Sequence, residues 1–414
     1  MSNITQKLAL SNDDFSPVAT EDTSVIVKLL PIIGVVFIAY LIIGLAMSVL
    51  PLHIHDGLGF STFTVGLVVG SQFMAAVFSR PWAGVYADQK GAKRAVIFGL
   101  IVAVASGALY LGSLQFIASP LTSITILLVG RIVLGVAESF IITGALSWGV
   151  TLAGVENTGK TMSWIGTALY AAYAVGAPVG TWLYAKDGFT AIALAAGIIP
   201  LVALFLVAPL RSTAPVSNSS ARPSLMSVIG AVWMPGLGVA VSGVGFGAIT
   251  TFIVLLFVQN GWERAWLALT LLSAAFIVGR VFFGHLPDKN GAKAAFVCIL
   301  IEASGLALIW FAPSSVFALT GVTLVGLGYS LVYPGFGVEA LRRASPENRG
   351  LAMGAYTAFL DVSLGFASPA LGLIAYGAGL NAVFLVSTFV VLGSALIALR
   401  LLSSSTTKTI PNLK

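Results

Sequence analysis

The feature that most constrains this chain is a series of apolar stretches, each about as long as a helix that crosses a membrane. A helix needs about 20 consecutive apolar residues to span a hydrocarbon core about 30 Å thick. Only 9% of the residues are charged and 58% are hydrophobic, whereas an ordinary soluble domain carries about 25% charged residues. Twelve such stretches fall near residues 28–52, 60–82, 95–116, 121–149, 161–184, 188–209, 228–258, 264–286, 293–312, 316–338, 350–376 and 380–401. The sequence therefore predicts an all-α integral membrane protein with twelve transmembrane helices.

The twelve predicted helices divide into two groups of six. Between the groups, Arg211–Ser224 is rich in Ser, Pro and Ala and lacks apolar periodicity, which is typical of a flexible linker. We predict a cytoplasmic N-terminal tail (1–27), a first six-helix bundle (28–210), a cytoplasmic linker (211–225), a second six-helix bundle (226–402) and a cytoplasmic C-terminal tail (403–414).

The positions of the basic residues predict the orientation in the membrane. If both termini are cytoplasmic, only Lys186 and Arg264 of the 21 Lys and Arg fall in outer loops, and Arg131 falls within a span. This asymmetry agrees with the positive-inside rule. The net charge of +6 is thus interpreted as topology, and no nucleic-acid partner is predicted.

The predicted loop between the second and third spans of each half contains an internal repeat. Arg80, Gly84, Asp88, Gly91, Ala92 and Lys93 recur 200 residues later as Arg280, Gly284, Asp288, Gly291, Ala292 and Lys293. A weaker repeat with an offset of 191 residues links Gly159, Met162 and Pro178 with Gly350, Met353 and Pro369. By this second offset Asp361 corresponds to Tyr170. Parallel repeats of six helices place a binding site near the membrane midplane, where the two halves meet.

The first copy of this loop resembles the signature of the major facilitator superfamily, Gly-x-x-x-Asp-x-x-Gly-x-Lys-Arg, on Gly84, Asp88, Gly91, Lys93 and Arg94. The resemblance implies the major facilitator fold, two pseudo-symmetric six-helix bundles that rock to give alternating access. It also implies that the loop is a cytoplasmic contact that stabilises the outward-facing state. We expect Gly84 to permit close helix packing, Asp88 to lie against a helix N-terminus, and Lys93 and Arg94 to supply pairing charges.

Two further motifs resemble those of proton-coupled exporters of the drug and arabinose-efflux type. Arg131-Ile-Val-Leu-Gly135-Val-Ala137 resembles an intramembrane arginine motif, although Leu134 stands where Gln is common. Gly176-Ala-Pro178-Val-Gly180 resembles the Gly-Pro bend of antiporters, for which a packing kink is the alternative interpretation.

The resemblance implies a multi-pass protein of the bacterial inner membrane that exports a small molecule by proton antiport, working as a monomer. The proton gradient supplies the energy, and no cofactor or metal is predicted. An importing proton symporter is the alternative function. An enzyme is not predicted, because the sequence contains no clustered catalytic set within the membrane.

Four ionisable residues fall inside predicted spans: Arg131, Glu138, Glu302 and Asp361. Each costs about 2.5 to 3.5 kcal/mol at mid-bilayer on insertion scales, so such residues are functional or mutually paired by default. We predict Glu138 as the proton-accepting site, because a carboxylate removed from water holds its proton more tightly. Arg131 lies on the same helix face and shares its cavity, and Asp361 is the second proton or substrate candidate. Hydrogen bonds between helices are the alternative role for both acids. Glu302 is predicted to be structural, because the resemblance implies that its helix is peripheral.

The helices expected by resemblance to line the central cleft carry several polar and aromatic residues. Such side chains suit a small amphipathic molecule, which could be a drug, a sugar or a small metabolite, metal chelators included. The candidates are Tyr40, Gln72, Tyr170, Tyr173, Thr250, Thr251, Tyr329, Ser330 and Tyr333.

Three other features are predicted to be structural. His53, His55 and Asp56 are expected to form an exposed, solvated cluster, since their spacing is weak evidence for a metal site. Cys298 is expected to be a small packing residue. A cytoplasmic salt-bridge cluster is predicted for Glu339, Arg342, Arg343, Glu347 and Arg349.

Overall fold

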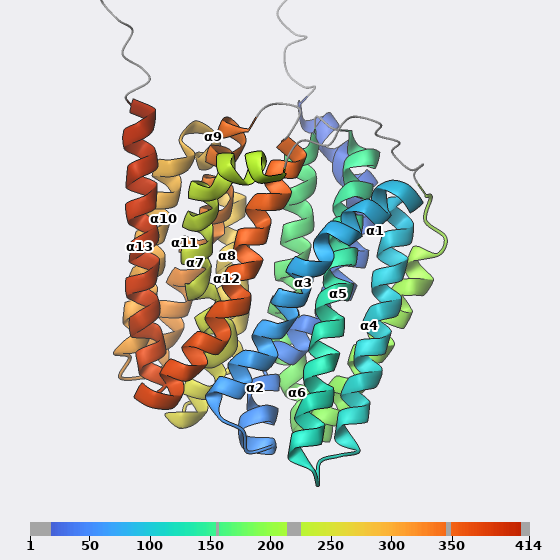
Figure 1. The fold of residues 1–414 in the computed structure, drawn as a ribbon, viewed down its shortest axis with the longest axis vertical. Coiled ribbons are helices and arrows are strands. Elements are labelled where there is room, and N and C mark those ends of the chain that lie inside the picture. Colours follow the sequence, from blue (N-terminus) through green and yellow to red (C-terminus); the bar gives the residue numbers. More distant parts are fainter. Residues whose placement is uncertain (1–17, 155–156, 213–224, 345–348, 407–414) are drawn as a thin grey trace, which may run out of the picture.

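The computed structural model describes residues 18–154, 157–212, 225–344 and 349–406, and in these ranges all regular secondary structure is helical. Figure 1 shows two bundles standing side by side, the first formed by α1 to α6 and the second by α7 to α13. The first bundle contains α1 (Val18–Met47), α2 (Leu50–Leu52), the π-helix η1 (His53–Gly57), α3 (Thr62–Lys90), α4 (Ala92–Leu114), α5 (Pro120–Ala153) and α6 (Thr158–Val207). The second contains α7 (Leu225–Gln259), α8 (Trp266–Phe283), α9 (Leu286–Lys289), α10 (Gly291–Trp310), α11 (Ser315–Arg343), α12 (Arg349–Ala378) and α13 (Leu380–Thr406).

The helix α6 accounts for two membrane spans. Its 50 residues would extend for about 75 Å at a rise of about 1.5 Å per residue, more than twice a hydrocarbon core of about 30 Å. At Gly188 the backbone leaves the helical region, with φ 64° and ψ −158°, a conformation that glycine adopts readily. Within the described ranges eleven helices are long and apolar enough to cross a membrane. Counted as two, α6 brings the number of spans in those ranges to twelve, as predicted.

The predicted domain boundaries differ from the helix ends in detail. Helix α1 begins at Val18, inside the predicted N-terminal tail, and α13 continues to Thr406, beyond the predicted end of the second bundle. Residues 1–17, 213–224 and 407–414, which carry most of the predicted tails and linker, lie outside the described residues.

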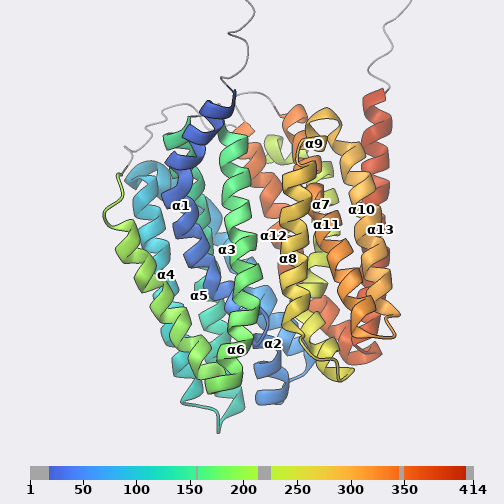
Figure 2. The same ribbon diagram turned by 180° about the vertical axis from the view of Figure 1, so that it is seen from behind.

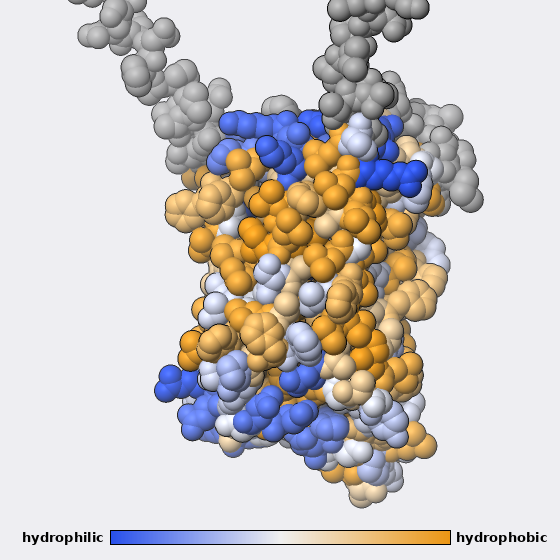
Figure 3. Space-filling model, turned by 90° about the vertical axis from the view of Figure 1, so that its left-hand side faces the viewer, coloured by the Kyte–Doolittle hydropathy of each residue, from blue (hydrophilic) through white to orange (hydrophobic). Residues whose placement is uncertain are grey.

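The surface is divided into an apolar band and two polar ends. On the face drawn in Figure 3, hydrophobic side chains cover most of the middle and hydrophilic side chains gather toward both ends. The first turn of α1 and the last turn of α13 lie at the same end of the molecule (Figure 1), which we call the terminal face. The opposite end, which carries η1, is the distal face. The band has the distribution expected of a protein whose middle is surrounded by lipid.

The two most extensive interfaces between the bundles are α3 against α12 and α6 against α8; Figure 2 shows α8 beside α6. In the first interface, small residues bring the backbones together. A Cβ at Gly66 would overlap Ser368, one at Gly70 would overlap Gly365, and one at Gly372 would overlap Thr62. The Thr62 hydroxyl donates a hydrogen bond of 2.9 Å to the carbonyl oxygen of Gly372. These contacts all lie on the distal side of the interface, which is therefore tightly closed there.

The second interface is held by different contacts. The Thr270 hydroxyl of α8 donates a hydrogen bond of 3.0 Å to the carbonyl oxygen of Ala174 on α6. One helical turn away, the rings of Tyr170 and Phe276 stack with centroids 3.6 Å apart. The internal repeat relates the two interfaces, because α8 is the counterpart of α3 and α12 is the counterpart of α6.

Candidate functional site

The candidate site is a set of polar side chains on α3, α5 and α12, buried among the helices. The Nε2 atom of Gln72 donates a hydrogen bond of 2.6 Å to Oε2 of Glu138, joining α3 to α5 within the first bundle. Two turns further along α3, Arg80 forms an ion pair with Asp361 of α12 across the interface between the bundles. Helix α3 therefore connects the predicted proton site with the contact between the two halves.

The charges of this site act on one another. Glu138 lies within electrostatic range of Asp361, Arg80 and Arg131, so the structure brings the three predicted charged candidates together and adds Arg80 to them. The phenol of Tyr40 lies within electrostatic range of Glu138, Arg80 and Asp361. Two acids balance two bases when all four are ionised. Protonation of one acid would leave a net positive charge in a region where charge is costly.

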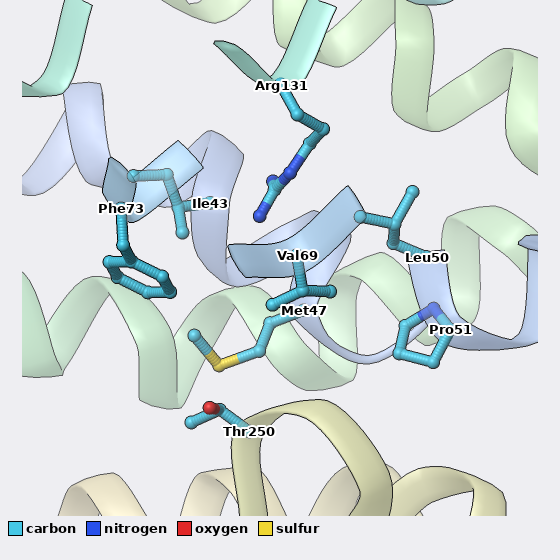
Figure 4. A pocket seen from close by; sticks show the side chains of 8 residues that line it. All are labelled: Ile43, Met47, Leu50, Pro51, Val69, Phe73, Arg131 and Thr250. Atoms are coloured by element: carbon cyan, nitrogen blue, oxygen red, sulfur yellow. The ribbon is translucent and has the colours of Figure 1, made fainter. Parts of the chain in front are cut away.

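Arg131 lies at a small cavity between the bundles. Its Nη1 atom donates a hydrogen bond of 3.4 Å to the Tyr110 hydroxyl, and Figure 4 shows its guanidinium pointing toward the cavity. Thr250 of α7 lies on the opposite side, so both bundles contribute candidates (Figure 4). The other lining residues are Ile43, Met47, Leu50, Pro51, Val69 and Phe73. The cavity volume is about 20 Å³, room for about one water molecule. It is too small for an organic substrate in this conformation.

Aromatic rings form a continuous row across the α6–α8 interface. Tyr40 of α1 contacts Tyr173 of α6, with centroids 6.3 Å apart, and Tyr173 contacts Tyr170 at 5.8 Å. The row continues from Tyr170 through Phe276 to Tyr329 of α11. The predicted tyrosines are thus brought together, and Phe276 joins them. The sequence could not identify Phe276, because one phenylalanine in an apolar span carries no signal of its own.

Three other polar candidates make contacts between helices. The hydroxyls of Tyr333 and Thr357 lie 2.6 Å apart, joining α11 to α12. The hydroxyls of Thr251 and Ser368 lie 3.4 Å apart, joining α7 to α12. Ser330 is buried against Gly279 of α8 within the second bundle. We assign Ser330 to packing.

The predicted packing role of Gly84 is wrong for this conformation. A Cβ placed on Gly84 would meet no atom within 4 Å, because the tight part of the α3–α12 interface lies nearer the distal face. Its counterpart Gly284 is exposed. Gly291, by contrast, packs against the backbone of Gly335 on α11.

Other members of the repeated loop have local structural roles. Gly91 adopts a φ of 95° at the turn between α3 and α4, a conformation that favours glycine. The predicted charge pairing of Lys93 takes another form: its Nζ atom donates hydrogen bonds of 2.8 and 2.7 Å to the carbonyl oxygens of Ala208 and Leu210, capping the end of α6. The side chains of Asp88, Arg94, Asp288 and Lys293 are exposed.

The glycines of the Gly-Pro segment pack closely against α1. A Cβ at Gly176 would overlap the backbone of Gly44, and one at Gly180 would overlap Leu45. Pro178 lies between them inside α6. The packing interpretation of this segment thus has direct structural support.

The interpretation of His53, His55 and Asp56 as an exposed cluster is wrong for His53. The π-helix η1 turns this side chain inward, where it is buried and its ring stacks on Phe189 with centroids 4.0 Å apart. His55 is half-buried, with Nδ1 2.7 Å from the carbonyl oxygen of Phe60, and Asp56 is exposed.

The remaining predicted structural residues lie away from the central charges. Glu302 is buried and accepts a hydrogen bond of 2.5 Å from the Ser242 hydroxyl, joining α10 to α7. Cys298 is buried as a free thiol. Within the predicted salt-bridge cluster, Glu339 and Arg342 form an ion pair of 2.9 Å. Glu347 and the side chain of Arg349 fall outside the described parts of the chain.

Comparisons with a family model and with individual relatives point to the same protein family. The model of the Major Facilitator Superfamily matches residues 32–345 and 267–413. An MFS-type transporter of Salmonella typhimurium is 40% identical over 377 residues, covering 91% of this chain and 97% of the relative. The MFS-type transporter YhhS of Escherichia coli is 40% identical over 366 residues, covering 88% of this chain and 90% of the relative.

Solved structures show the same fold at low sequence identity. A D-xylose-proton symporter is 15% identical with a TM-score of 0.73, covering 91% of this chain and 96% of that chain. The nucleoside transporter NupG is 12% identical with a TM-score of 0.73, and the match covers 90% of this chain and 99% of that chain.

Proposed function

The chain belongs to the Major Facilitator Superfamily, and from this premise we propose that it exports a small amphipathic molecule in exchange for protons. As a family member it is a multi-pass membrane transporter. The proposal concerns the coupling, the direction and the residues that carry them. The observation that supports it is the polar network in which Gln72 holds Glu138 while Arg80, on the same helix, pairs with Asp361 across the bundles.

In this proposal Glu138 carries the proton. When Glu138 is ionised, its charge attracts Arg80 and competes with Asp361 for the guanidinium. When it is protonated, Arg80 is left to Asp361, and the ion pair between the bundles strengthens. A proton on α5 thereby changes the contact between α3 and α12. Such a contact is the kind of element on which alternating access depends.

We further propose that the terminal face is cytoplasmic, that the membrane is the bacterial inner membrane and that the functional unit is a monomer. The distribution of Lys and Arg supports the orientation. With the α3–α12 interface closed on the distal side, this conformation is closed toward the outside in that orientation. Both described ends of the chain then lie in the cytoplasm.

Cotransport of the proton and the substrate into the cell is a second candidate function. The observation that favours it is the packing of Gly176 and Gly180 against α1. This contact explains the glycines of the Gly-Pro motif by helix packing, so the motif by itself does not separate antiport from symport.

Proton movement in proteoliposomes distinguishes the two candidates. Vesicles with an acidic interior and a trapped pH-sensitive dye are mixed with candidate solutes from outside. The protein is oriented with its terminal face on the outside of the vesicle. Antiport then predicts that a substrate accelerates proton efflux. Symport predicts that protons enter with the substrate when no proton gradient is imposed. If no solute moves protons in a folded wild-type protein, the proposed coupling is contradicted.

A further inference from the structure

The internal repeat places a second arginine at the other interface between the bundles. Arg280 of α8 is the counterpart of Arg80, and Tyr170 of α6 is the counterpart of Asp361. Arg80 pairs with Asp361 across α3 and α12. Where symmetry would place the matching carboxylate beside Arg280, the chain has a tyrosine. Tyr170 lies within electrostatic range of Arg280, so the two counterparts face the same interface.

The guanidinium of Arg280 lies in the interface and not on the lipid-facing surface. Its carbon atom lies 5.2 Å from the centroid of the Phe276 ring, the ring that stacks on Tyr170. Its Nη1 atom lies 3.0 Å from the position that a Cβ would occupy at Gly166 of α6. Glycine at position 166 therefore leaves room for the guanidinium between the two bundles.

Arg280 is half-buried, and within the described ranges it lacks an acidic partner of the kind that Arg80 has. Across the described ranges, no carboxylate lies within 4.0 Å of its guanidinium. Four phenol groups, those of Tyr170, Tyr329, Tyr333 and Tyr356, lie within electrostatic range of the guanidinium. Tyr333 also lies within range of Arg80 and Asp361, so Arg280 belongs to the same central region as the candidate site. An unpaired charge inside a membrane protein is expensive and marks a functional position by default.

We propose that Arg280 binds an anionic group of the transported molecule, a carboxylate or a phosphate. A guanidinium presents paired N–H donors that match the oxygens of either group. The hydroxyls of Tyr170 and Tyr333 can donate additional hydrogen bonds, and the faces of Phe276 and Tyr170 can contact the organic part of the molecule. The inference rests on the proposed transport function, because it takes Arg280 to lie on the path of the substrate.

Direct binding tests this inference without requiring transport. The purified protein is placed in nanodiscs of phosphatidylcholine and titrated calorimetrically with benzoate, citrate and inorganic phosphate, and with tetraphenylphosphonium as a cationic control. At least one anion should bind the wild type. Its affinity should fall about tenfold or more in Arg280→Gln and less in Arg280→Lys, which keeps the charge but loses the paired donors. Arg343→Gln, which removes an exposed arginine of α11, should bind like the wild type.

A second pair of variants tests the symmetry argument. Tyr170→Asp supplies the carboxylate that the repeat lacks, so it should pair with Arg280 and abolish anion binding. Tyr170→Phe should retain binding, weakened by the loss of one hydroxyl. Thermal unfolding and size-exclusion profiles check that each variant is folded.

Several results would overturn the inference. These are the absence of anion binding in the folded wild type, equal affinity in Arg280→Gln, and binding of the cation alone. Nanodiscs with added phosphatidylglycerol test for a lipid headgroup: if that lipid displaces the anion completely, the occupant of the site is lipid. Because binding is measured without a gradient, anion binding can be found where proton coupling fails, and proton coupling can be found where anion binding fails.

Discussion

Arg80 and Asp361 form an ion pair that connects α3 of the first bundle to α12 of the second. Both side chains are largely buried, with exposed fractions of 20% and 11%. Removing one partner of a buried pair leaves an uncompensated charge, whereas exchanging the partners preserves the balance. The pair therefore ties the charge state of the site to the contact between the two halves.

Exchanging these two charges tests the ion pair. Arg80→Gln and Asp361→Asn should each destabilise the protein, by on the order of 3 kcal/mol, and should abolish transport. The double variant Arg80→Asp with Asp361→Arg should recover most of the thermal stability, measured as Tm in detergent. A double variant no more stable than the singles would show that the pair does not hold the bundles together.

Removing the Gln72 side-chain amide tests the hydrogen bond to Glu138. In Gln72→Leu the ionised carboxylate loses the donor that stabilises it. The midpoint of the pH profile of transport should therefore move to higher pH. Gln72→Asn, with a shorter amide, should give a smaller shift. If the pH profile of transport is unchanged in both variants, the hydrogen bond from Gln72 has no part in proton coupling.

Enlarging a glycine in the α3–α12 interface should open its distal side. A side chain at Gly70 would overlap Gly365, so Gly70→Val should move the equilibrium away from the conformation described. Spin labels are attached at the exposed positions Asp56 and Ala378 in a Cys298→Ala background. The distance between them, measured by double electron–electron resonance, should lengthen. Gly230→Ala, where a Cβ meets no atom within 4 Å, is the control and should leave the distances unchanged.

Gly84 has open space around it in this conformation, which makes it a test of the opposite one. If the part of α3 around Gly84 packs closely when the terminal face closes, Gly84→Val should block transport without lowering the Tm of the present conformation. The distance between the same two spin labels should then stay short, even under conditions that open the distal side of the wild type. Normal transport by Gly84→Val would show that this glycine is not a close contact in either conformation.

The spans and the two bundles could be predicted from the sequence because lipid imposes length and apolarity on each helix. The residues of the site were only partly predictable. Glu138, Asp361 and Arg131 stand out as charges within apolar spans, but Arg80 belongs to a loop motif at a helix end. Its partner Asp361 is distant in the sequence, and no local pattern links them. Conversely, His53 resembled a loop residue, and only the π-helix turns it inward.

The most direct test of the account is to separate proton coupling from substrate exchange in Glu138→Gln. Proteoliposomes that contain this variant, once a substrate is known, should still exchange labelled for unlabelled substrate, because binding and alternating access remain. They should show no substrate-driven proton movement and no pH dependence of transport, whereas the wild type shows both. If Glu138→Gln moves protons with its substrate as the wild type does, Glu138 is not the coupling site and the account is contradicted.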